Sequence, residues 1–483
     1  MRLAKNMAIY AGADLLGRSI GLLTSPITTH LLTPKQYGAS PLLAAVWALV
    51  ALAQFGGMDW AYPFFRAQDT EERNRGKILA TASFVATVSA LTIWAAFFLV
   101  ASVGPWLEGY AAVDKRELVL FLLGLGPATL TGWYLYALRF MHQALPYARV
   151  ILLGRVASVV AGLPLLMVVV QKERLAVMFA VSFVVQLFAW GWALWELRRV
   201  GAWPYMWNLF EPDLARKMLR YGFFLIPGGL VYSASAVADR LLVGWFSGPE
   251  EVAILALSIS LGSSVLMMKN WLALVWDPQL VEWISTKDSQ IYRPKLQAGF
   301  LGLSAIFFSL TCLSAVWSDW IIHLLYPSFY ARTIRLVPIL IFAGSCSVLS
   351  LVAVATTMIA NSPKYHLPIY AGGLLINLVV GVSTIPKVGA LGAVLGTAAS
   401  EVFILFAWGL LGRVVLKNLF LDWSVPSVLG AFSIIFVAFY QPGMLLQSQA
   451  MLERLGVTTL LLASASYLLW SYRPSNGWRR AFA

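Results

Sequence analysis

A small set of ionisable side chains lies inside long apolar stretches of the sequence. A charged group within a bilayer is costly, and it is retained mainly where it binds an ion or substrate, carries a proton or pairs with another group. These positions are therefore the functional candidates. Acids and bases balance among them, so the set alone does not indicate an anionic substrate. They are Asp14, Arg18, Asp59, Arg155, Asp239, Arg240, Lys269 and Glu401.

Depth within the expected helices separates these candidates. Arg18 and Glu401 fall near the middle of their apolar stretches, farthest from water. Asp14 precedes Arg18 by about one helical turn on the same face, so Arg18 either lines a wet cavity or forms a structural pair with Asp14. Arg155 and Lys269 lie about 10 Å from the expected inner helix ends, where reaching to lipid headgroups explains them equally well.

The other three candidates lie nearer to helix ends. Asp239 and Arg240 fall near the outer end of the apolar stretch 219–246. Asp59 falls near the inner end of the stretch 40–65, where we expect a contact with a helix terminus or a neighbouring helix rather than a binding site.

The sequence lacks the motifs of nucleotide-driven or catalytic machinery. It contains no phosphate-binding loop of the form GxxxxGKS or GxxxxGKT, and no loop long enough for an ATPase domain. Cys312 and Cys346 lie in apolar stretches and are expected to be small buried side chains, and the four histidines are dispersed. We therefore expect no enzyme activity, no cofactor and no metal, with transport energy supplied by an ion gradient, the membrane potential or the substrate gradient.

Composition places these residues in a polytopic membrane protein. Of the 483 residues, 60% are hydrophobic and 12% are charged, about half the usual charged share. The first apolar stretch is too long for a cleavable signal peptide, and Thr-Pro-Lys-Gln follows it. The net charge of +13 is better explained by topology signals than by nucleic-acid binding.

Apolar stretches of spanning length recur along the whole chain. About fourteen transmembrane helices are expected, with no soluble domain of ordinary size. Most loop Lys and Arg residues fall on one side when both termini are placed in the cytoplasm. The predicted helices are 7–31, 40–65, 77–103, 117–139, 148–170, 175–197, 219–246, 251–276, 297–317, 333–360, 366–386, 388–411, 425–441 and 455–472.

The chain also repeats internally. Pro34 aligns with Pro249 and Pro63 with Pro278 at one constant offset, and QALPY at 143–147 matches NSPKY at 361–365 at a slightly larger one. Because each repeat holds six helices, both enter the membrane in the same sense, and the substrate path is expected between them. The predicted parts are a six-helix lobe 1–197, a cytoplasmic linker 198–218, a second six-helix lobe 219–416, and two extra helices with a cytoplasmic tail, 417–483.

The linker is the longest inner loop. Trp203, Pro204, Tyr205 and Trp207 indicate a segment that lies on the membrane surface, as a short amphipathic helix does.

An ordered set of motifs is similar to one known family. A first helix ending in LLTPKQYG and a second ending in GMDWAYPFFR resemble the polysaccharide flippases of the multidrug/oligosaccharidyl-lipid/polysaccharide exporter superfamily. ADRLLVGWFSGPEEVAILALS looks like that family's repeat of the first motif. NSPKYHLPIYAGGLLINLVV followed by IPKVGALGAVLGTAASE is similar to its eleventh and twelfth helices. The resemblance covers about residues 5–415.

The resemblance implies an all-α fold with two six-helix lobes around a central cavity. It implies movement of undecaprenyl-diphosphate-linked oligosaccharide to the outer leaflet of the bacterial inner membrane, for O-antigen, capsule or exopolysaccharide synthesis. Membrane lipids and other polysaccharide-assembly membrane proteins are the implied partners. Arg18, Arg155, Arg240 and Lys269 are the predicted substrate-binding residues, and Asp14, Asp239 and Glu401 the candidates for coupling to H⁺ or Na⁺.

Three alternatives remain open. A small-cation exporter of the same superfamily would depend on cavity acids rather than on Arg18. A lipid II flippase shares the helix number but is expected to carry more cationic residues in its first lobe. A membrane glycosyltransferase or polymerase would need a large outer loop with clustered acids or arginines, which the sequence lacks.

Overall fold

In the computed structural model of the chain, the regular elements of the described residues are all helices. The described residues are 2–69, 71–201, 207–223, 226–285, 289–354, 365–415, 423–439 and 447–471, and they contain no strand. Within them, nine helices are long and apolar enough to cross a membrane. The predicted all-α polytopic class is confirmed, whereas the number of fourteen spans stays a prediction.

The chain divides into two compact units, Met1–Ala253 and Ile254–Ala483. The predicted lobe boundaries lie elsewhere and stay predictions. The first unit holds α1 (Arg2–Leu31), α2 (Pro34–Val50), η1 (Ala51–Ala53), α3 (Met58–Gln68), α4 (Glu72–Val103), α5 (Trp106–Ala111), α6 (Lys115–Phe140), α7 (Ala144–Val168), η2 (Gln171–Glu173), α8 (Arg174–Arg199), η3 (Trp207–Leu209), α9 (Pro212–Phe223) and the start of α10 (Ile226–Ser285).

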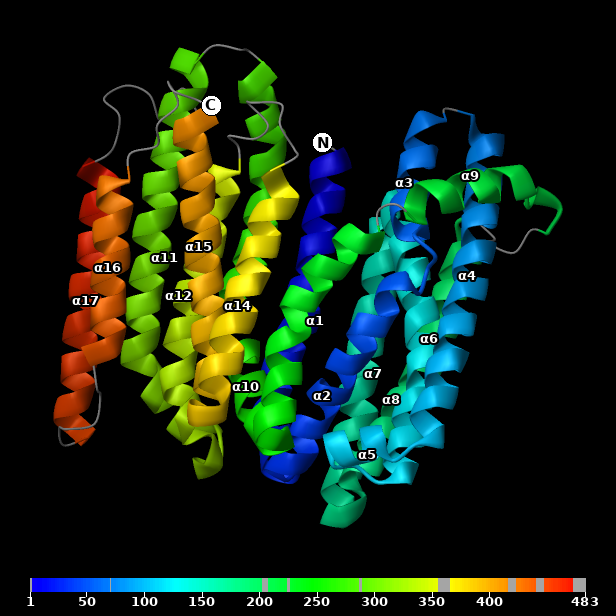
Figure 1. Ribbon diagram of the computed structural model, residues 1–483, viewed down its shortest axis with the longest axis horizontal. Helices are drawn as coiled ribbons and strands as arrows, with labels where there is room; N and C mark the ends of the chain where they lie inside the picture. Colours follow the sequence, from blue (N-terminus) through cyan, green and yellow to red (C-terminus); the bar gives the residue numbers. More distant parts are fainter. Residues whose placement is uncertain are drawn as a thin grey trace. The chain divides into compact units, whose positions relative to one another are not determined.

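The second unit holds the rest of α10 and the helices that follow it (Figure 1). Its pairs α14 and α15, and α11 and α12, pack along one another. The elements are α11 (Ser289–Leu325), η4 (Ser328–Arg332), α12 (Thr333–Ala353), α14 (His366–Val388), α15 (Ala390–Val415), α16 (Ser424–Phe439) and α17 (Gln447–Ser471).

The predicted stop after the first helix is confirmed, and the same residues begin the next helix. Thr33 caps α2: its hydroxyl accepts from the Gln36 backbone N–H at 3.2 Å, and the Gln36 side chain accepts from the Thr33 N–H at 3.1 Å. Pro34 occupies the first helical turn, where its missing N–H costs nothing. The TPKQ segment therefore follows the end of α1 and begins α2.

The prediction of one continuous helix over 40–65 is wrong. Gly56 and Gly57 adopt positive φ angles of 59° and 76°, which end the helical path between α2 and α3. A Cβ atom on Gly57 would lie 2.5 Å from the carbonyl carbon of Gly222 in α9, so glycine also permits a backbone contact here. Asp59 consequently sits in the first turn of α3, a helix-terminus position as expected.

The boundary between the seventh and eighth predicted helices also carries a glycine. Within α10, Gly248 leaves helical geometry with φ 81° and ψ 177°, immediately before Pro249. Gly38 of α2 lies so close to the Pro249 carbonyl that a side chain at position 38 would collide with it. The two matched segments TPKQYG and SGPEEV, related in the sequence, therefore contact each other inside the first unit.

The seventh predicted helix begins later than expected. α9 ends at Phe223 and α10 begins at Ile226, so residues 219–223 belong to a separate amphipathic helix rather than to the span. α9 buries Ala215, Met218 and Gly222 against the first unit. Trp203–Tyr205 of the linker, the segment 361–364 of the NSPKY motif and the tail after 471 lie outside the described residues.

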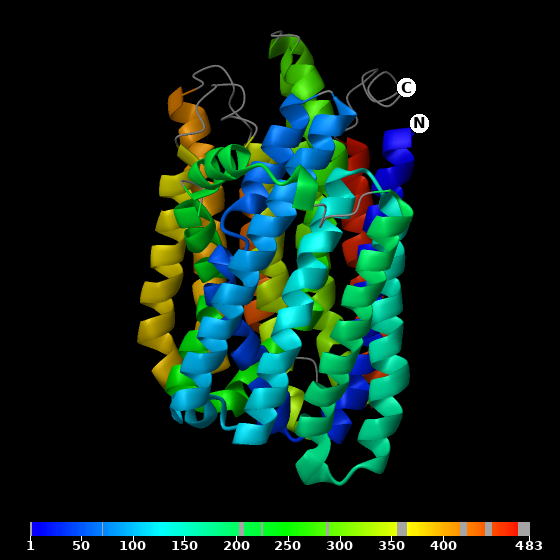
Figure 2. The same cartoon turned by 90° about the vertical axis from the view of Figure 1, so that its right-hand side faces the viewer.

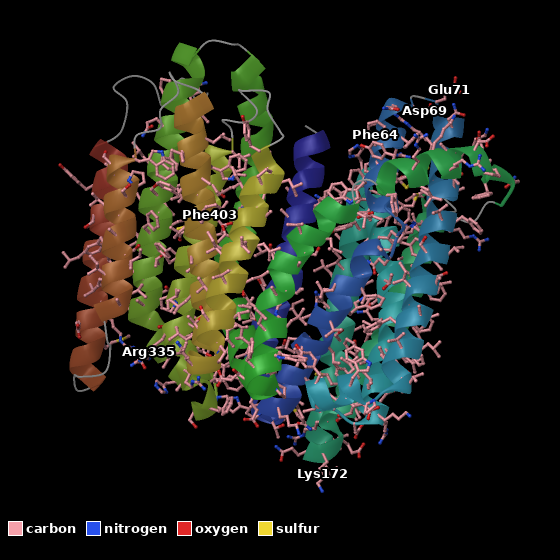
Figure 3. All side chains as sticks on the ribbon, in the orientation of Figure 1. Phe64, Asp69, Glu71, Lys172, Arg335 and Phe403 are labelled. Atoms are coloured by element: carbon pink, nitrogen blue, oxygen red, sulfur yellow. The ribbon has the colours of Figure 1, made fainter. Side chains whose placement is uncertain are left out.

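The first unit is built on a core of large aromatic residues. Trp133 and Tyr134 of α6 and Tyr62 of α3 are fully buried together. The Trp133 indole donates to the Ser83 hydroxyl of α4 at 3.1 Å. α6 and α8 pack along each other (Figure 2). In Figure 3, Asp69 and Glu71 mark one end of this unit and Lys172 the other.

The second unit is organised around α12. Nearly every side chain of this helix is buried, including the small polar residues Ser345, Ser347 and Ser350. α11 and α15 cover it, and α16 and α17 pack on α11. The Arg454 guanidinium of α17 binds the Asp319 carboxylate of α11 at 2.7 Å, which ties the extra helices to the second unit.

Candidate functional site

The α1–α7 face of the first unit carries three of the predicted residues. Gly17 of α1 is buried, and a Cβ placed there would lie 3.3 Å from Ile151 and 3.6 Å from Cγ of Arg155 on α7. One turn earlier, the Tyr147 hydroxyl of α7 donates to the Asp14 carboxylate at 3.3 Å. Because α1 and α7 touch along this line, Arg18 and Arg155 lie on adjoining helices at a similar level.

Both arginines of this face are exposed. Within the described part of the chain, neither Arg18 nor Arg155 has a hydrogen-bond or ion-pair partner. Asp14 is bonded to Tyr147 instead of Arg18. Of the two interpretations of Arg18, the structural pair with Asp14 is therefore not formed, and two cations remain open to a ligand. We call Arg18 and Arg155 the arginine face.

Asp239 and Arg240 lie on α10, in another part of the first unit. Asp239 is 9% exposed, and Nε of Arg240 is buried with no hydrogen-bond partner among the described residues. The Asp239 carboxylate acts electrostatically on Arg240. Next to them, the Tyr110 hydroxyl of α5 donates to the Leu241 carbonyl at 2.6 Å. Burial raises the pKa of Tyr110 to about 12, so this donor stays protonated at physiological pH.

The remaining two predicted residues lie in the second unit. Lys269 of α10 donates from Nζ to the Ser347 hydroxyl of α12 at 2.7 Å. Glu401 lies on α15, which packs along α12. The hydrogen-bond partner of Lys269 among the described residues is therefore a buried hydroxyl.

Sequence reasoning did not single out Ser347 or Tyr147. Serines are common in membrane helices, where they bond to their own backbone, as Ser350 does to the Ser347 carbonyl at 2.7 Å. The only sequence signal was the run Ser345, Ser347 and Ser350 in an otherwise apolar helix. That run does not say which serine meets a charge.

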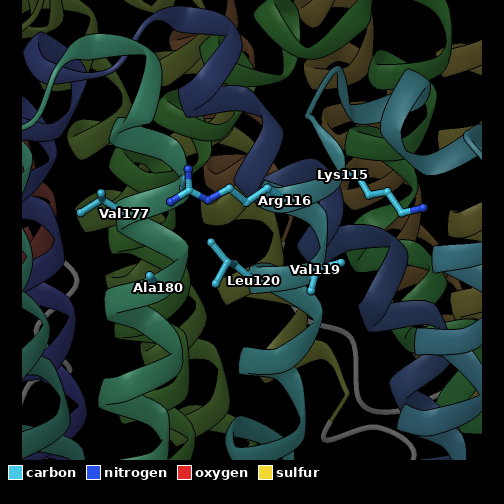
Figure 4. Close-up of a pocket in the computed structure, with 7 residues that line it drawn as sticks. Lys115, Arg116, Val119, Leu120, Val177 and Ala180 are labelled. Carbon is cyan, nitrogen blue, oxygen red and sulfur yellow. The ribbon is translucent and has the colours of Figure 1, made fainter.

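A pocket of about 390 Å³ lies between the start of α6 and α8. Arg116 reaches from α6 toward α8, whereas Lys115 points away (Figure 4). The Arg116 guanidinium is already bound to the Glu173 carboxylate at 2.7 Å. The walls are otherwise formed mainly by aliphatic residues. Its lining residues are Lys115, Arg116, Val119, Leu120, Ala176, Val177 and Ala180.

Metal-ligand groupings are absent from the part of the chain that the structure describes. It holds no cluster of three His, Cys, Asp or Glu residues suited to a metal ion. Cys312 and Cys346 are both buried as free thiols, as the sequence predicts.

Comparison with known proteins identifies one family whose profile covers much of the chain. A profile of the family described as "Polysaccharide biosynthesis protein" matches residues 3–283, more than half of the chain. No curated protein matches the sequence significantly.

Several solved structures share the fold. The lipid II flippase MurJ in an inward closed conformation has 12% sequence identity and a TM-score of 0.73, with 96% of this chain and 98% of that chain covered. An inward-facing multidrug resistance MATE family transporter of the MOP superfamily has 14% identity and a TM-score of 0.62, covering 86% and 98%. A Vibrio cholerae MATE transporter in the bent form has 11% identity and a TM-score of 0.51, covering 89% and 99%.

Proposed function

Because the chain belongs to the polysaccharide biosynthesis protein family, we propose that it is a flippase for undecaprenyl-diphosphate-linked oligosaccharide. It moves this lipid from the inner to the outer leaflet of the bacterial inner membrane, with both chain termini in the cytoplasm. The product feeds synthesis of O-antigen, capsule or exopolysaccharide. Other membrane proteins of polysaccharide assembly are its expected partners.

The arginine face is the observation that carries this proposal. Arg18 and Arg155 are exposed and unpaired on adjoining helices, within the described residues. Two guanidinium groups left without acids are costly in a membrane protein unless an anionic ligand visits them. Arginine binds phosphate oxygens through paired N–H donors, so each of the two groups suits the diphosphate of the proposed substrate.

The proposed transport cycle depends on which parts of the substrate are soluble in water and which in lipid. The sugars and the diphosphate need water, so they travel in a wet path between the two six-helix repeats, with the diphosphate at the arginine face. The polyprenyl chain is apolar and stays in lipid. The repeats rock between an inward-open and an outward-open state, and an ion gradient or the membrane potential drives the cycle, with H⁺ or Na⁺ as the coupling ion at Asp14, Asp239 or Glu401.

The other predicted cations have different surroundings. Arg240 is half-buried next to Asp239, and its Nε atom is enclosed, so it is less accessible to substrate than the two exposed arginines. Lys269 already donates to the Ser347 hydroxyl, so its ammonium is less available than the two arginines. We therefore rank Arg18 and Arg155 first among the substrate-binding candidates.

Complementation tests the role of the arginine face. In a strain lacking this protein, the wild-type gene restores surface polysaccharide, and we expect Arg18→Ala at equal protein level to fail while Arg18→Lys partly succeeds. Arg335→Ala is the matched control, because Arg335 is an exposed arginine in the first turn of α12, in the second unit (Figure 3). Normal polysaccharide with Arg18→Ala at wild-type level would remove the proposed role of Arg18.

A second candidate function is flipping of lipid II, and the TM-score of 0.73 with the lipid II flippase MurJ favours it. Both lipids carry a diphosphate, so the arginine face does not separate them. Purified protein in liposomes separates them directly, with fluorescent lipid II and a lipid-linked oligosaccharide assayed side by side. Faster movement of lipid II would favour the second candidate. Export of a cationic dye, with Arg18→Ala still active, would indicate a small-cation exporter.

A further inference from the structure

Helix α9 is fastened to other helices of the first unit at both of its ends. Just before α9, the Glu211 N–H donates to the Thr81 hydroxyl of α4 at 3.2 Å, and the Glu211 carboxylate binds the Lys77 ammonium of α4 at 3.4 Å. Near the other end, the Tyr221 ring stacks on Phe64 of α3, with ring centroids 4.3 Å apart. These contacts fix the position of α9 within the first unit.

The same contacts set the depth of α9. Lys77 and Thr81 lie in the first turns of Asn74–Val103, a stretch of 30 residues that is long and apolar enough to cross a membrane. At about 45 Å, this stretch matches the thickness of a bilayer with both of its headgroup layers. In Figure 1, α9 runs across α3 and α4 rather than along them. We therefore place α9 in the plane of the membrane, at the depth of the lipid headgroups.

The exposed side of α9 carries three cations, Arg216, Lys217 and Arg220. Arg216 and Arg220 lie about one turn apart on the same edge of the helix. Within the part of the chain that the structure describes, no ion pair holds any of the three. Asp213 is the one acid within α9, so the helix keeps an excess of positive charge. We call Arg216, Lys217 and Arg220 the α9 cation edge.

Phospholipid headgroups are the groups that a cation meets at this depth. A Lys or Arg near an anionic bilayer surface contributes about fivefold to the affinity for that surface. Helices that lie on membranes combine such residues with apolar ones, and α9 exposes Leu219 to 39% and Phe223 to 70%. An acidic soluble protein would match the charges, but it would have to displace lipid to reach a helix at headgroup depth. The observations therefore favour a lipid surface over a protein partner.

We propose that the α9 cation edge binds the headgroups of anionic phospholipids in the surrounding leaflet. A phosphodiester with one net negative charge attracts the edge, whereas a zwitterionic headgroup offers it no net charge. Because Gly222 of α9 contacts Gly57, bound lipids also hold the break between α2 and α3 at the membrane surface. These lipids belong to the bilayer and are not the transported substrate, so the proposal does not depend on which lipid the protein carries.

Fluorescence quenching tests the proposal with the purified full-length protein in neutral detergent. Phe223→Cys gives an exposed thiol at the end of α9, and Cys312 and Cys346 are buried, so a thiol-reactive fluorophore labels position 223. The labelled protein is titrated with phosphatidylglycerol or phosphatidylcholine that carries a nitroxide quencher. We expect phosphatidylglycerol to bind about tenfold more tightly than phosphatidylcholine.

Removal of the cations should abolish this preference. In the labelled Arg216→Gln/Lys217→Gln/Arg220→Gln protein, we expect phosphatidylglycerol to bind as weakly as phosphatidylcholine. The matched control removes three exposed lysines from the end of the first unit that holds Lys172, and it should bind phosphatidylglycerol as the unaltered chain does. This control is Lys35→Gln/Lys115→Gln/Lys172→Gln.

Four results would overturn the proposal. The first is equal affinity for the two lipids before any cation is removed, and the second is an unchanged affinity for phosphatidylglycerol after all three are removed. The third is an equal loss in the lysine control, since overall charge rather than α9 would then attract the lipid. The fourth is full displacement of phosphatidylglycerol by inorganic phosphate, because the edge would then bind a free anion rather than a lipid surface.

Folding of the triple variant is checked by its unfolding temperature in lipid-free detergent. The three side chains are exposed and hold no ion pair among the described residues, so this temperature should not change. If the triple variant does not accumulate as folded protein, Lys217→Gln and Arg220→Gln decide. Each should weaken the binding of phosphatidylglycerol about fivefold, and unchanged affinity in both would overturn the proposal.

Discussion

Arg155 in the first unit and Lys269 in the second lie at similar depths, each about 10 Å from the expected inner end of its predicted helix. Their surroundings nevertheless differ. Arg155 is exposed beside Gly17 of α1 and has no partner within the described residues, whereas Lys269 donates to the buried Ser347 hydroxyl. A cation in a membrane helix is tolerated either by facing water or by meeting a polar partner. The first arrangement leaves charge for a ligand, and the second uses the charge inside the protein.

The largest expected effect on stability comes from removing Lys269. Lys269→Met removes the hydrogen bond from the ammonium to the buried Ser347 hydroxyl and should lower the free energy of unfolding by about 2 kcal/mol. Arg155→Met should change it by about 0.5 kcal/mol or less, because the arginine has no partner to leave behind. Chemical unfolding in detergent measures both, and equal losses would contradict the contrast between the two residues.

The arginine face should show its effect in transport rather than in stability. Arg18→Ala and Arg155→Ala should each lower the initial rate of lipid flipping in liposomes about tenfold, which corresponds to about 1.4 kcal/mol. If both bind one diphosphate, the double variant should lose less than the product of the single losses. Unfolding measurements on the same preparations serve as the control. If the loss of flipping rate in the double variant equals the product of the two single losses, the two arginines act at separate sites.

A smaller effect is expected at Ser347. Ser347→Ala removes the hydroxyl that accepts from Lys269, so the free energy of unfolding should fall by about 1 kcal/mol. Ser350→Ala is the matched control on the same helix, because among the described residues the Ser350 hydroxyl bonds to the α12 backbone. A loss at Ser350 as large as the loss at Ser347 would mean that serine packing, not the hydrogen bond to Lys269, supports α12.

The smallest effect is expected at Tyr147. Tyr147→Phe removes the hydrogen bond to Asp14 but keeps the ring contact with Tyr10, whose centroid lies 5.0 Å away. The expected loss in the free energy of unfolding is about 0.5 kcal/mol. The freed Asp14 carboxylate can then turn to Arg18, so flipping should slow as well. An unchanged flipping rate would show that Asp14 does not compete with substrate for Arg18.

Several features of the fold could be predicted because they depend on neighbouring residues alone. Thr33-Pro34 ends one helix and caps the next through groups only three residues apart. The burial of Cys312 and Cys346 follows from the apolar stretches around them. The helix break at Gly56-Gly57 was missed, because a glycine pair in an apolar stretch is also tolerated within a membrane helix. Contact with Gly222 of α9 requires the break here.

The sequence by itself determined the class of the protein, the approximate helices and the short list of costly charges. Each follows from composition and local pattern, and membrane burial makes those signals strong. Only the tertiary structure decided which charges are paired. A helix that is apolar all round does not reveal which side meets which neighbour, and the partners are distant in the chain: Tyr147 and Asp14 are 133 residues apart, and Lys269 and Ser347 are 78 apart. As a result of this long-range packing, Arg18 is exposed and Lys269 forms a hydrogen bond with Ser347.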